Sequence, residues 1–305
     1  MMNGSLTESA VLAEGLVKSY GKVKALGGVS LDVRHGETFG IIGPDGAGKS
    51  TLFRLLTSLL VPDSGSAQVE GLDTVKDYRE IRKIIGYMPG KFSLYQDLTV
   101  EENLTFFATL FGTTIDENYH LIEDIYKQIE PFKARMAGKL SGGMKQKLAL
   151  CCALIHKPKV LFLDEPTTGV DPVSRKEFWD MLGRLKNDGI TILVSTPYMD
   201  EAGRCDRIAL IRNGKFLTVN SPAGIIAEFP DRLYSVRSDR MHALLGDLLA
   251  YSGTIRAFSF GESVHLSTGD GFSEDDLRKF LQDRKHNNVE INAIRPSVED
   301  CFMRI

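Results

Sequence analysis

The 305-residue sequence lacks any apolar run that approaches the roughly 18 to 20 residues needed to cross a bilayer. Residues 1–10 are polar and have no apolar core of the kind found in a secretion signal. Internal repeats and low-complexity tracts are also missing. These absences argue against a membrane-spanning chain. We therefore expect a soluble protein, long enough for one large domain and a smaller one.

Cysteine is scarce, and neither sign of charge is in excess. The four cysteines have neither metal-ligand spacing nor the density of a secreted disulfide scaffold, which indicates thiols in a reducing compartment: Cys151, Cys152, Cys205 and Cys301. The 37 Lys and Arg residues are balanced by 40 Asp and Glu residues, for a net charge of -3. Because nucleic-acid-binding proteins usually carry a basic face or stripe, we expect no nucleic-acid partner.

A glycine-rich segment over residues 43–51 carries the strongest functional signal. It fits the phosphate-binding pattern G-x-x-x-x-G-K-[ST] and reads Gly43-Pro44-Asp45-Gly46-Ala47-Gly48-Lys49-Ser50-Thr51. The glycines let backbone N–H groups point inward around phosphate oxygens, and Lys49 adds a positive charge. The Ser50 hydroxyl is placed to ligate Mg²⁺. An apolar run before the segment and a helical pattern after it complete a nucleoside triphosphate site.

Two adjacent carboxylates, Asp164 and Glu165, end the apolar run that begins at Val160. Successive strand residues point to opposite sides, so the two side chains cannot have the same role. We expect Asp164 to join the Mg²⁺ shell and Glu165 to polarise a water for attack on the terminal phosphate. A strand that ends in Asp-Glu is also common at a plain sheet edge. The phosphate loop in the same chain favours the catalytic interpretation.

A third motif, Ser141-Gly142-Gly143, precedes a helical segment rich in Leu and Ala. Ser141 is placed as the N-cap, and such a helix end offers a hydroxyl, free N–H groups and a positive dipole to an anion. By itself, Ser-Gly-Gly would indicate only a flexible turn. Together with the other two motifs, the sequence Leu-Ser-Gly-Gly-Met resembles the signature of ATP-binding cassette (ABC) ATPases.

This resemblance covers about residues 10–220, and the remaining tail is similar to the C-terminal extension of drug-resistance-type exporter ATPases. It implies that two cassettes stack head to tail, so that Ser141, Gly142 and Gly143 serve the nucleotide on a partner's phosphate loop. It further implies that Tyr20 stacks on adenine. The loop around Asp171 would touch the partner cassette, although Asp171 and Pro172 would also begin a helix without any partner.

The expected fold class is α/β, a P-loop NTPase cassette with a mixed sheet core. We assign residues 8–220 to the ATP-binding domain, with a helical insert at about 91–145, and residues 221–305 to a small α+β extension. In the cassette, strands are expected near 11–19, 25–33, 38–43, 68–70, 160–164, 191–195 and 207–211, and helices near 49–60, 100–110, 121–129, 142–155 and 173–185. In the α+β extension, we expect ordered segments near 233–236, 243–250, 254–259, 264–267, 274–281 and 289–295.

Two positions depart from the family pattern. Gly90 follows Tyr87-Met88-Pro89 where the family carries a glutamine, and Pro197 stands where it carries a histidine that contacts the terminal phosphate. Proline offers no donor, so that contact is absent unless Thr196 substitutes. We therefore expect tight ATP binding and slow hydrolysis. Gln96 and His156 are no evident replacements, and His156, at a helix end, is expected at the surface.

The resemblance implies a nucleotide-binding subunit of an ABC exporter, peripheral on the cytoplasmic face of the cell membrane. Its cofactors would be ATP and Mg²⁺, and its partners a second cassette, in a homodimer or heterodimer, and an integral membrane permease. The segment 91–98, with Phe92 and Tyr95, is the expected docking surface for the permease. Alternatives are a regulatory cassette that completes the site of a partner cassette with little hydrolysis of its own, a non-transport regulator, and half of a tandem protein.

Overall fold

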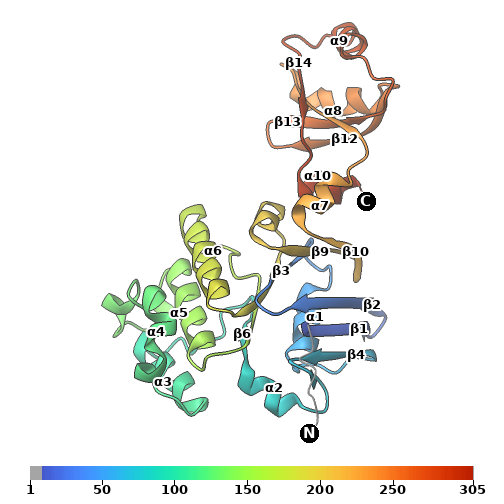
Figure 1. Ribbon diagram of the computed structural model, residues 1–305. Helices are drawn as coiled ribbons and strands as arrows, with labels where there is room; N and C mark the ends of the chain where they lie inside the picture. Colours follow the sequence, from blue (N-terminus) through green and yellow to red (C-terminus); the bar gives the residue numbers. More distant parts are fainter. Residues whose placement is uncertain (1–8, 305) are drawn as a thin grey trace. The chain divides into compact units, whose positions relative to one another are not determined.

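The computed structural model describes residues 9–304, which divide into two compact units after Pro222. Each unit has its own sheets and its own apolar core. Figure 1 labels the helices and strands of both units. The first unit contains every motif that the sequence singles out for nucleotide binding.

An antiparallel sheet of order β2-β1-β4-β5 opens the first unit. Its strands are β1 (Ser9–Tyr20), β2 (Val23–Arg34), β4 (Ser64–Val69) and β5 (Leu72–Asp73). Beside it lies a six-stranded sheet of order β10-β9-β3-β8-β7-β6. This second sheet consists of β3 (Thr38–Ile42), β6 (Ile85–Met88), β7 (Val160–Asp164), β8 (Thr191–Thr196), β9 (Arg207–Arg212) and β10 (Lys215–Asn220).

The six-stranded sheet places the chemistry of the site at one edge. Strands β9, β3, β8, β7 and β6 are parallel, and only β10 runs antiparallel to its neighbour. Every residue of β3, β7 and β8 is buried, as expected of parallel strands that are covered on both faces. The carboxyl ends of these three strands therefore meet at one edge, where ligands bind in open α/β sheets.

Six helices accompany these sheets: α1 (Lys49–Leu56), α2 (Tyr78–Ile84), α3 (Val100–Leu110), α4 (Ile115–Tyr126), α5 (Gly142–Leu154) and α6 (Pro172–Asn187). Helices α3 and α4 begin with capping boxes, in which Thr99 pairs with Glu102 and Thr114 with Glu117. Figure 1 shows α3, α4 and α5 grouped together, apart from α1 and the antiparallel sheet. The phosphate loop and the signature segment therefore belong to different parts of the unit.

The second unit has the β-α-β-β-α-β order and the all-antiparallel sheet of a ferredoxin-like fold. Its sheet, of order β12-β13-β11-β14, consists of β11 (Arg232–Arg237), β12 (Thr254–Phe260), β13 (Ser263–Thr268) and β14 (Glu290–Ile294), and its two long helices are α8 (Met241–Leu249) and α9 (Glu274–Asp283). Two short helices, α7 (Pro222–Ala227) and α10 (Val298–Arg304), flank this core. The buried Asp300 of α10 bonds to His265 of β13, with 2.6 Å between oxygen and Nδ1.

Several elements differ from the sequence-based expectation. The first helix was expected to reach residue 60, but α1 ends at Leu56, because Ser58 adopts the left-handed region with φ of 57°. Strands β6 and β10 and helices α2, α7 and α10 were not expected. They are four to seven residues long, too short for a periodic pattern to stand out.

Candidate nucleotide-binding site

The phosphate loop runs from the end of β3 to the start of α1, and its backbone needs glycine at two positions. A Cβ on Gly43 would lie 2.2 Å from the carbonyl oxygen of Ile211, and one on Gly48 would lie 2.5 Å from that of Ala25. Gly48 also has a φ of 107°. As the N-cap of α1, Gly48 provides no side-chain cap, so the first N–H groups of the helix remain available to an anion.

Lys49 folds back along its own loop. Its ammonium donates to the carbonyl oxygens of Gly43 at 2.8 Å and Pro44 at 3.0 Å, and lies 3.1 Å from Oε1 of Glu165. The Lys49 side chain is 2% exposed, whereas that of Glu165 is 23% exposed. The structure thus brings the basic residue of one motif into contact with the acidic residue of another.

The two carboxylates are positioned by Ser195, the fifth residue of β8. Its hydroxyl donates to Oδ1 of Asp164 at 2.6 Å and accepts from the backbone N–H of Glu165 at 3.1 Å. Glu165 has a φ of 50°, in the left-handed region, which turns the chain sharply after β7. The two side chains therefore have different surroundings, because Asp164 is buried while Glu165 reaches the solvent-accessible edge.

Gly90 and the strand end that precedes Pro197 lie near these carboxylates, since Thr196 directly follows Ser195. A Cβ on Gly90 would lie 3.1 Å from the carbonyl oxygen of Asp164, so this residue sits directly at the site. The Thr196 hydroxyl donates to Oε2 of Glu201 at 2.6 Å in a buried bond. The hydroxyl hydrogen of Thr196 is therefore already engaged by Glu201.

Most other residues of the loop are more accessible, and so is Tyr20. Pro44, Asp45 and Gly46 are exposed, Ala47 is buried, and Ser50 and Thr51 are half-buried. Tyr20, the last residue of β1, is 46% exposed. A flat aromatic surface is thus open to solvent in the same unit.

Ser141, Gly142, Gly143 and Asp171 form a second group, which we call the signature surface. Ser141 caps α5 by accepting from the N–H of Met144, and Asp171 caps α6 by accepting from the N–H groups of Val173 and Ser174. These backbone bonds lower the pKa of Asp171. A Cβ on Gly143 would lie 3.1 Å from Oγ of Ser174, so the two helix starts lie side by side.

His156, expected at the surface, is instead half-buried, and that prediction was wrong. Its ring stacks on Phe111 with 3.8 Å between centroids, and Nε2 lies 2.8 Å from the carbonyl oxygen of Ile85. Burial lowers the pKa of this histidine. The residue ties the end of α5 to β6, a contact between distant segments that a helix-end position in the sequence does not reveal.

The donor set agrees with Mg²⁺ rather than with a protein-enclosed metal. No group of three or more His, Cys, Asp or Glu side chains suited to a metal occurs within residues 9–304. Mg²⁺ is usually held by one or two carboxylates together with phosphate oxygens and waters. Asp164 and Ser50 each carry a side-chain oxygen near the phosphate loop, and such oxygens fit that pattern.

A phosphate loop between the buried parallel strand β3 and a helix, with an acidic pair at the end of β7, two strands away in the same sheet, defines a P-loop nucleotide-binding protein. The ABC transporter family model matches residues 26–168. The chain is 34% identical over 304 residues to the Nod factor export ATP-binding protein I of Rhizobium sp. (strain N33), covering 98% of each chain. It is also 39% identical to the doxorubicin resistance ATP-binding protein DrrA of Mycobacterium tuberculosis, covering 93% of that protein. The chain therefore belongs to the ATP-binding proteins of ABC transporters.

Two further comparisons define how far the similarity extends. The chain is 38% identical to the probable multidrug ABC transporter ATP-binding protein YbhF of Escherichia coli (strain K12), but spans only 52% of that protein's length. A solved ATP-binding cassette, MJ0796 bound to ADP and Pi, is 26% identical, with a TM-score of 0.63 over 69% of this chain and 98% of its own. These likenesses confirm the expected α/β cassette fold.

Three polar residues at the site, Ser195, Thr167 and Glu201, were missed by the sequence analysis. Thr167 and Thr196 donate to the two carboxylate oxygens of Glu201, and Ser195 bonds to Asp164. None of the three belongs to a spaced motif. Their partners come from other strands and loops, so only the tertiary contacts identify them.

Proposed function

We propose that this chain binds ATP with Mg²⁺ and hydrolyses it to drive export through a separate membrane permease. The observation that carries the proposal is the contact between Lys49 and Glu165 at the edge formed by β3 and β7. Family membership supports ATP hydrolysis in general, and the relatives named for export and drug resistance favour an exporter over a non-transport regulator.

In this mechanism, residues 43–51 surround the phosphates. The Lys49 ammonium gives up its hydrogen bonds to the carbonyl oxygens of Gly43 and Pro44 and donates to phosphate oxygens instead. Ser50 and Asp164 would hold Mg²⁺, which neutralises charge on the phosphates. Glu165 accepts a proton from the attacking water as a general base. Tyr20 would stack on adenine, and Ser141, Gly142 and Gly143 would close the site of a partner cassette, with Asp171 beside them.

Replacing Glu165→Gln tests this assignment. A general base contributes about 10²- to 10⁴-fold to a rate, so hydrolysis should fall by at least ~100-fold while ATP affinity stays near that of the parent. Glu177→Gln is the matched control, because Glu177 is an exposed glutamate paired with Lys147 away from the phosphate loop. Parental turnover in Glu165→Gln would contradict the catalytic role.

We further propose that hydrolysis is slow, because Gly90 and Pro197 replace two polar side chains of the family and Thr196 is bonded to Glu201. Loss of one positioned donor slows such chemistry by about 10²- to 10³-fold. Pro197→His should therefore raise turnover of the purified chain without changing ATP affinity. Brisk, Glu165-dependent hydrolysis by the parent would show that the departures are harmless.

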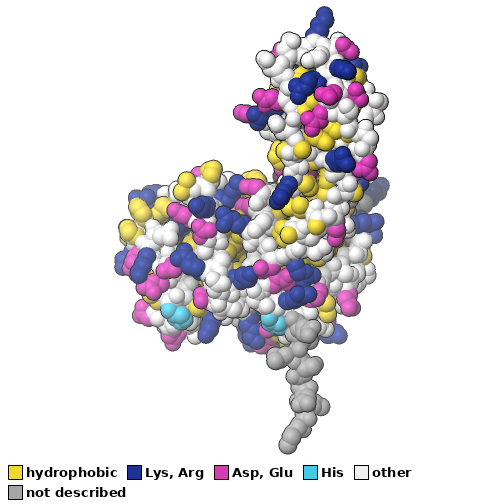
Figure 2. Space-filling model, turned by 45° about the horizontal axis from the view of Figure 1, so that its top comes forward, with side chains coloured by type: hydrophobic (Ala, Val, Ile, Leu, Met, Phe, Trp, Pro, Cys, Tyr) yellow, Lys and Arg dark blue, Asp and Glu magenta, His cyan; other side chains and the backbone are white. Residues whose placement is uncertain are grey.

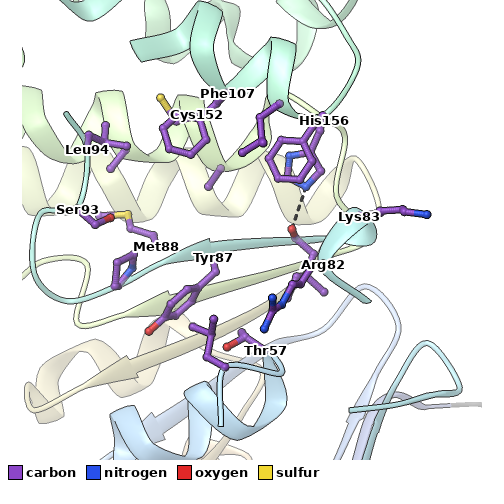
Figure 3. Close-up of a pocket in the computed structure, with 17 residues that line it drawn as sticks. Thr57, Arg82, Lys83, Tyr87, Met88, Ser93, Leu94, Phe107, Cys152 and His156 are labelled. Carbon is purple, nitrogen blue, oxygen red and sulfur yellow. Dashed lines mark hydrogen bonds between the residues drawn. The ribbon is translucent and has the colours of Figure 1, made fainter. Parts of the chain in front are cut away.

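The permease would dock at a cavity of about 450 Å³ between β6 and the helices α3 and α5. Figure 3 shows Tyr87 and Met88 on one side of this cavity and Phe107 and Cys152 on the other. Its rim includes Leu59 and Leu110, which are 49% and 63% exposed. Such an accessible apolar groove suits a helical segment of a partner protein, because apolar anchors at helical spacing fill a groove of this kind.

The docking segment 91–98 adjoins this cavity through Ser93 and Leu94. Tyr95 is 50% exposed and packs edge-on against Phe106, while Phe92 lies beneath the Lys145 ammonium. Replacing Phe92 and Tyr95 with Asp should abolish co-purification with the permease and leave ATP affinity unchanged. A comparable loss of ATP affinity would refute the placement of this surface.

Peripheral attachment to the inner face of the cell membrane would follow from that docking. No helix within residues 9–304 is long and apolar enough to cross a bilayer. In Figure 2, Lys and Arg side chains on the visible face alternate with Asp and Glu. We therefore propose attachment through the permease and a second cassette, and no nucleic-acid partner.

A further inference from the structure

Glu201 is a buried carboxylate with both oxygens bonded to hydroxyl groups. Thr167 donates to Oε1 at 2.8 Å and Thr196 donates to Oε2 at 2.6 Å. The three residues are at most 3% exposed. The nearest cation is Arg175, whose Nε lies 3.8 Å from Oε1, so hydroxyl donors rather than a close ion pair hold this carboxylate.

A carboxylate in such surroundings is a costly element to bury. Desolvation penalises the charge, and a single cation at nearly 4 Å offsets only part of that penalty. An apolar side chain would fill the same volume without this cost. The arrangement therefore points to a role beyond packing, and the residues that Glu201 joins indicate which role.

Its two hydroxyl partners belong to different loops of the site. Thr196 ends β8, and its carbonyl oxygen accepts from the N–H of Gly43, the first residue of the phosphate loop. Thr167 lies two residues after Glu165 in the segment that leads to Asp171. Glu201 therefore bridges a strand end in contact with the phosphate loop and the loop that carries both the proposed base and the signature-surface carboxylate.

Arg175 ties the same network to the start of α6. It also donates to Asp200 at 3.0 Å and lies over the Tyr198 ring at 4.8 Å. The backbone N–H of Tyr198 donates to the Thr196 hydroxyl, so that hydroxyl both donates one bond and accepts one. The connections run without a break from the phosphate loop to the helix that Asp171 caps.

We infer that Glu201 is a positioning residue that transmits nucleotide binding at the phosphate loop to the segment 165–171. This inference rests on the proposed ATP site and adds a route from it to the signature surface. When the phosphate loop tightens on ATP, Thr196 and Glu201 hold Thr167, and with it Glu165 and Asp171, in one arrangement. Glu201 itself touches neither nucleotide nor water in this role.

Amide hydrogen exchange with and without ATP and Mg²⁺ tests the inference on the full chain, in the Glu165→Gln background so that ATP persists. ATP should slow exchange in residues 43–51 and also in 165–171. Thr196→Val removes one of the two hydroxyl groups that donate to Glu201. In this variant ATP should still slow exchange in residues 43–51 but no longer in 165–171. Thr167→Val should do the same, and the double variant should be no worse, because both substitutions break one connection.

Thr191→Val is the matched control, because Thr191 is an equally buried threonine at the opposite end of β8 that accepts from the N–H of Gly36. It should retain both effects. Unchanged slowing of 165–171 in Thr196→Val, or no such slowing in the parent protein, would overturn the inference. If ATP fails to slow residues 43–51 even in the parent, the proposed ATP site is wrong, which is a separate result.

A kinetic readout distinguishes positioning from general structural damage. In the chain with Glu165 intact, Thr196→Val should lower kcat about 10-fold, as loss of an outer-shell partner typically does, with KM for ATP within twofold of the parent. A higher KM with unchanged kcat would instead place Thr196 in nucleotide binding and contradict the relay. Thr191→Val should change neither constant.

Discussion

The phosphate-loop site and the signature surface differ in how their polar groups are satisfied. At the phosphate loop, Lys49 and Asp164 are buried and bonded to other protein groups, including Glu165 and Ser195. On the signature surface, Ser141, Gly142 and Asp171 are exposed, and the Ser141 and Asp171 side chains accept bonds from the N–H groups of the helices they cap.

This difference bears on the proposed division of the nucleotide site between two chains. The phosphate-loop site already contains partners for its charges, so the chain can organise it alone. The signature surface exposes the starts of α5 and α6 and the Ser141 side chain, and helix N-termini of this kind favour anions. The comparison thus agrees with a chain that holds one nucleotide and helps to close another.

The largest effect is expected from Lys49→Ala. This change removes the positive charge from the phosphate loop and should lower hydrolysis by about 10²- to 10³-fold, with ATP binding also lost. Titration calorimetry with ATP and Mg²⁺ measures the binding. Lys127→Ala, which breaks only an exposed pair with Glu123, is the control. Parental heats in Lys49→Ala would contradict the assignment of the whole site.

A smaller and more selective effect is expected from Ser141→Ala. Hydrolysis should fall about 10-fold because a hydrogen bond to a charged group contributes about 1.5 kcal/mol or more, while ATP affinity of the isolated chain stays unchanged. Ser273→Ala is matched to it, since Ser273 caps α9 in the same way. Both variants should lose about 1 kcal/mol of stability, and only the first should lose activity. Equal hydrolysis rates in Ser141→Ala and Ser273→Ala would contradict a role of the signature surface in hydrolysis.

The smallest effect concerns His156, which contacts β6 just after the end of α5, the helix that Ser141 caps. Burial lowers the pKa of His156 in the folded protein from its usual value of about 6.5. Below pH 6.5 the unfolded chain therefore binds a proton at this histidine more readily than the folded protein does, which favours unfolding. The stability of the parent relative to His156→Phe should therefore be greatest above pH 6.5 and shrink as the pH falls. At pH 8 the loss of the bond to Ile85 should cost about 1 kcal/mol.

Urea denaturation at several pH values measures this difference, with His120→Phe as an exposed control. A gap between parent and His156→Phe that widens toward acid pH would contradict the buried, neutral histidine. The control variant should follow the parent at each pH.

Features encoded in a contiguous stretch of sequence could be predicted, whereas very short elements and contacts between distant residues could not. The phosphate loop, the Asp164–Glu165 pair and the capped start of α5 are local patterns, and β7 and α3 have the predicted bounds. The short strands β6 and β10 offered no such pattern. His156 was misplaced because its burial depends on Phe111 and Ile85, which lie 45 or more residues away along the chain.

The sequence by itself determined that this chain has a phosphate loop and belongs with the ABC ATPases. These motifs are short and contiguous, so their glycine spacing and their lysine can be recognised without knowing the fold. The sequence also predicts departures from the family pattern at Gly90 and Pro197. Only the tertiary structure decided that Thr196 is bonded to Glu201 and that Ser195 holds Asp164. Those partnerships depend on which strand ends meet at one edge of the sheet, and strand order is set by the packing of the whole core.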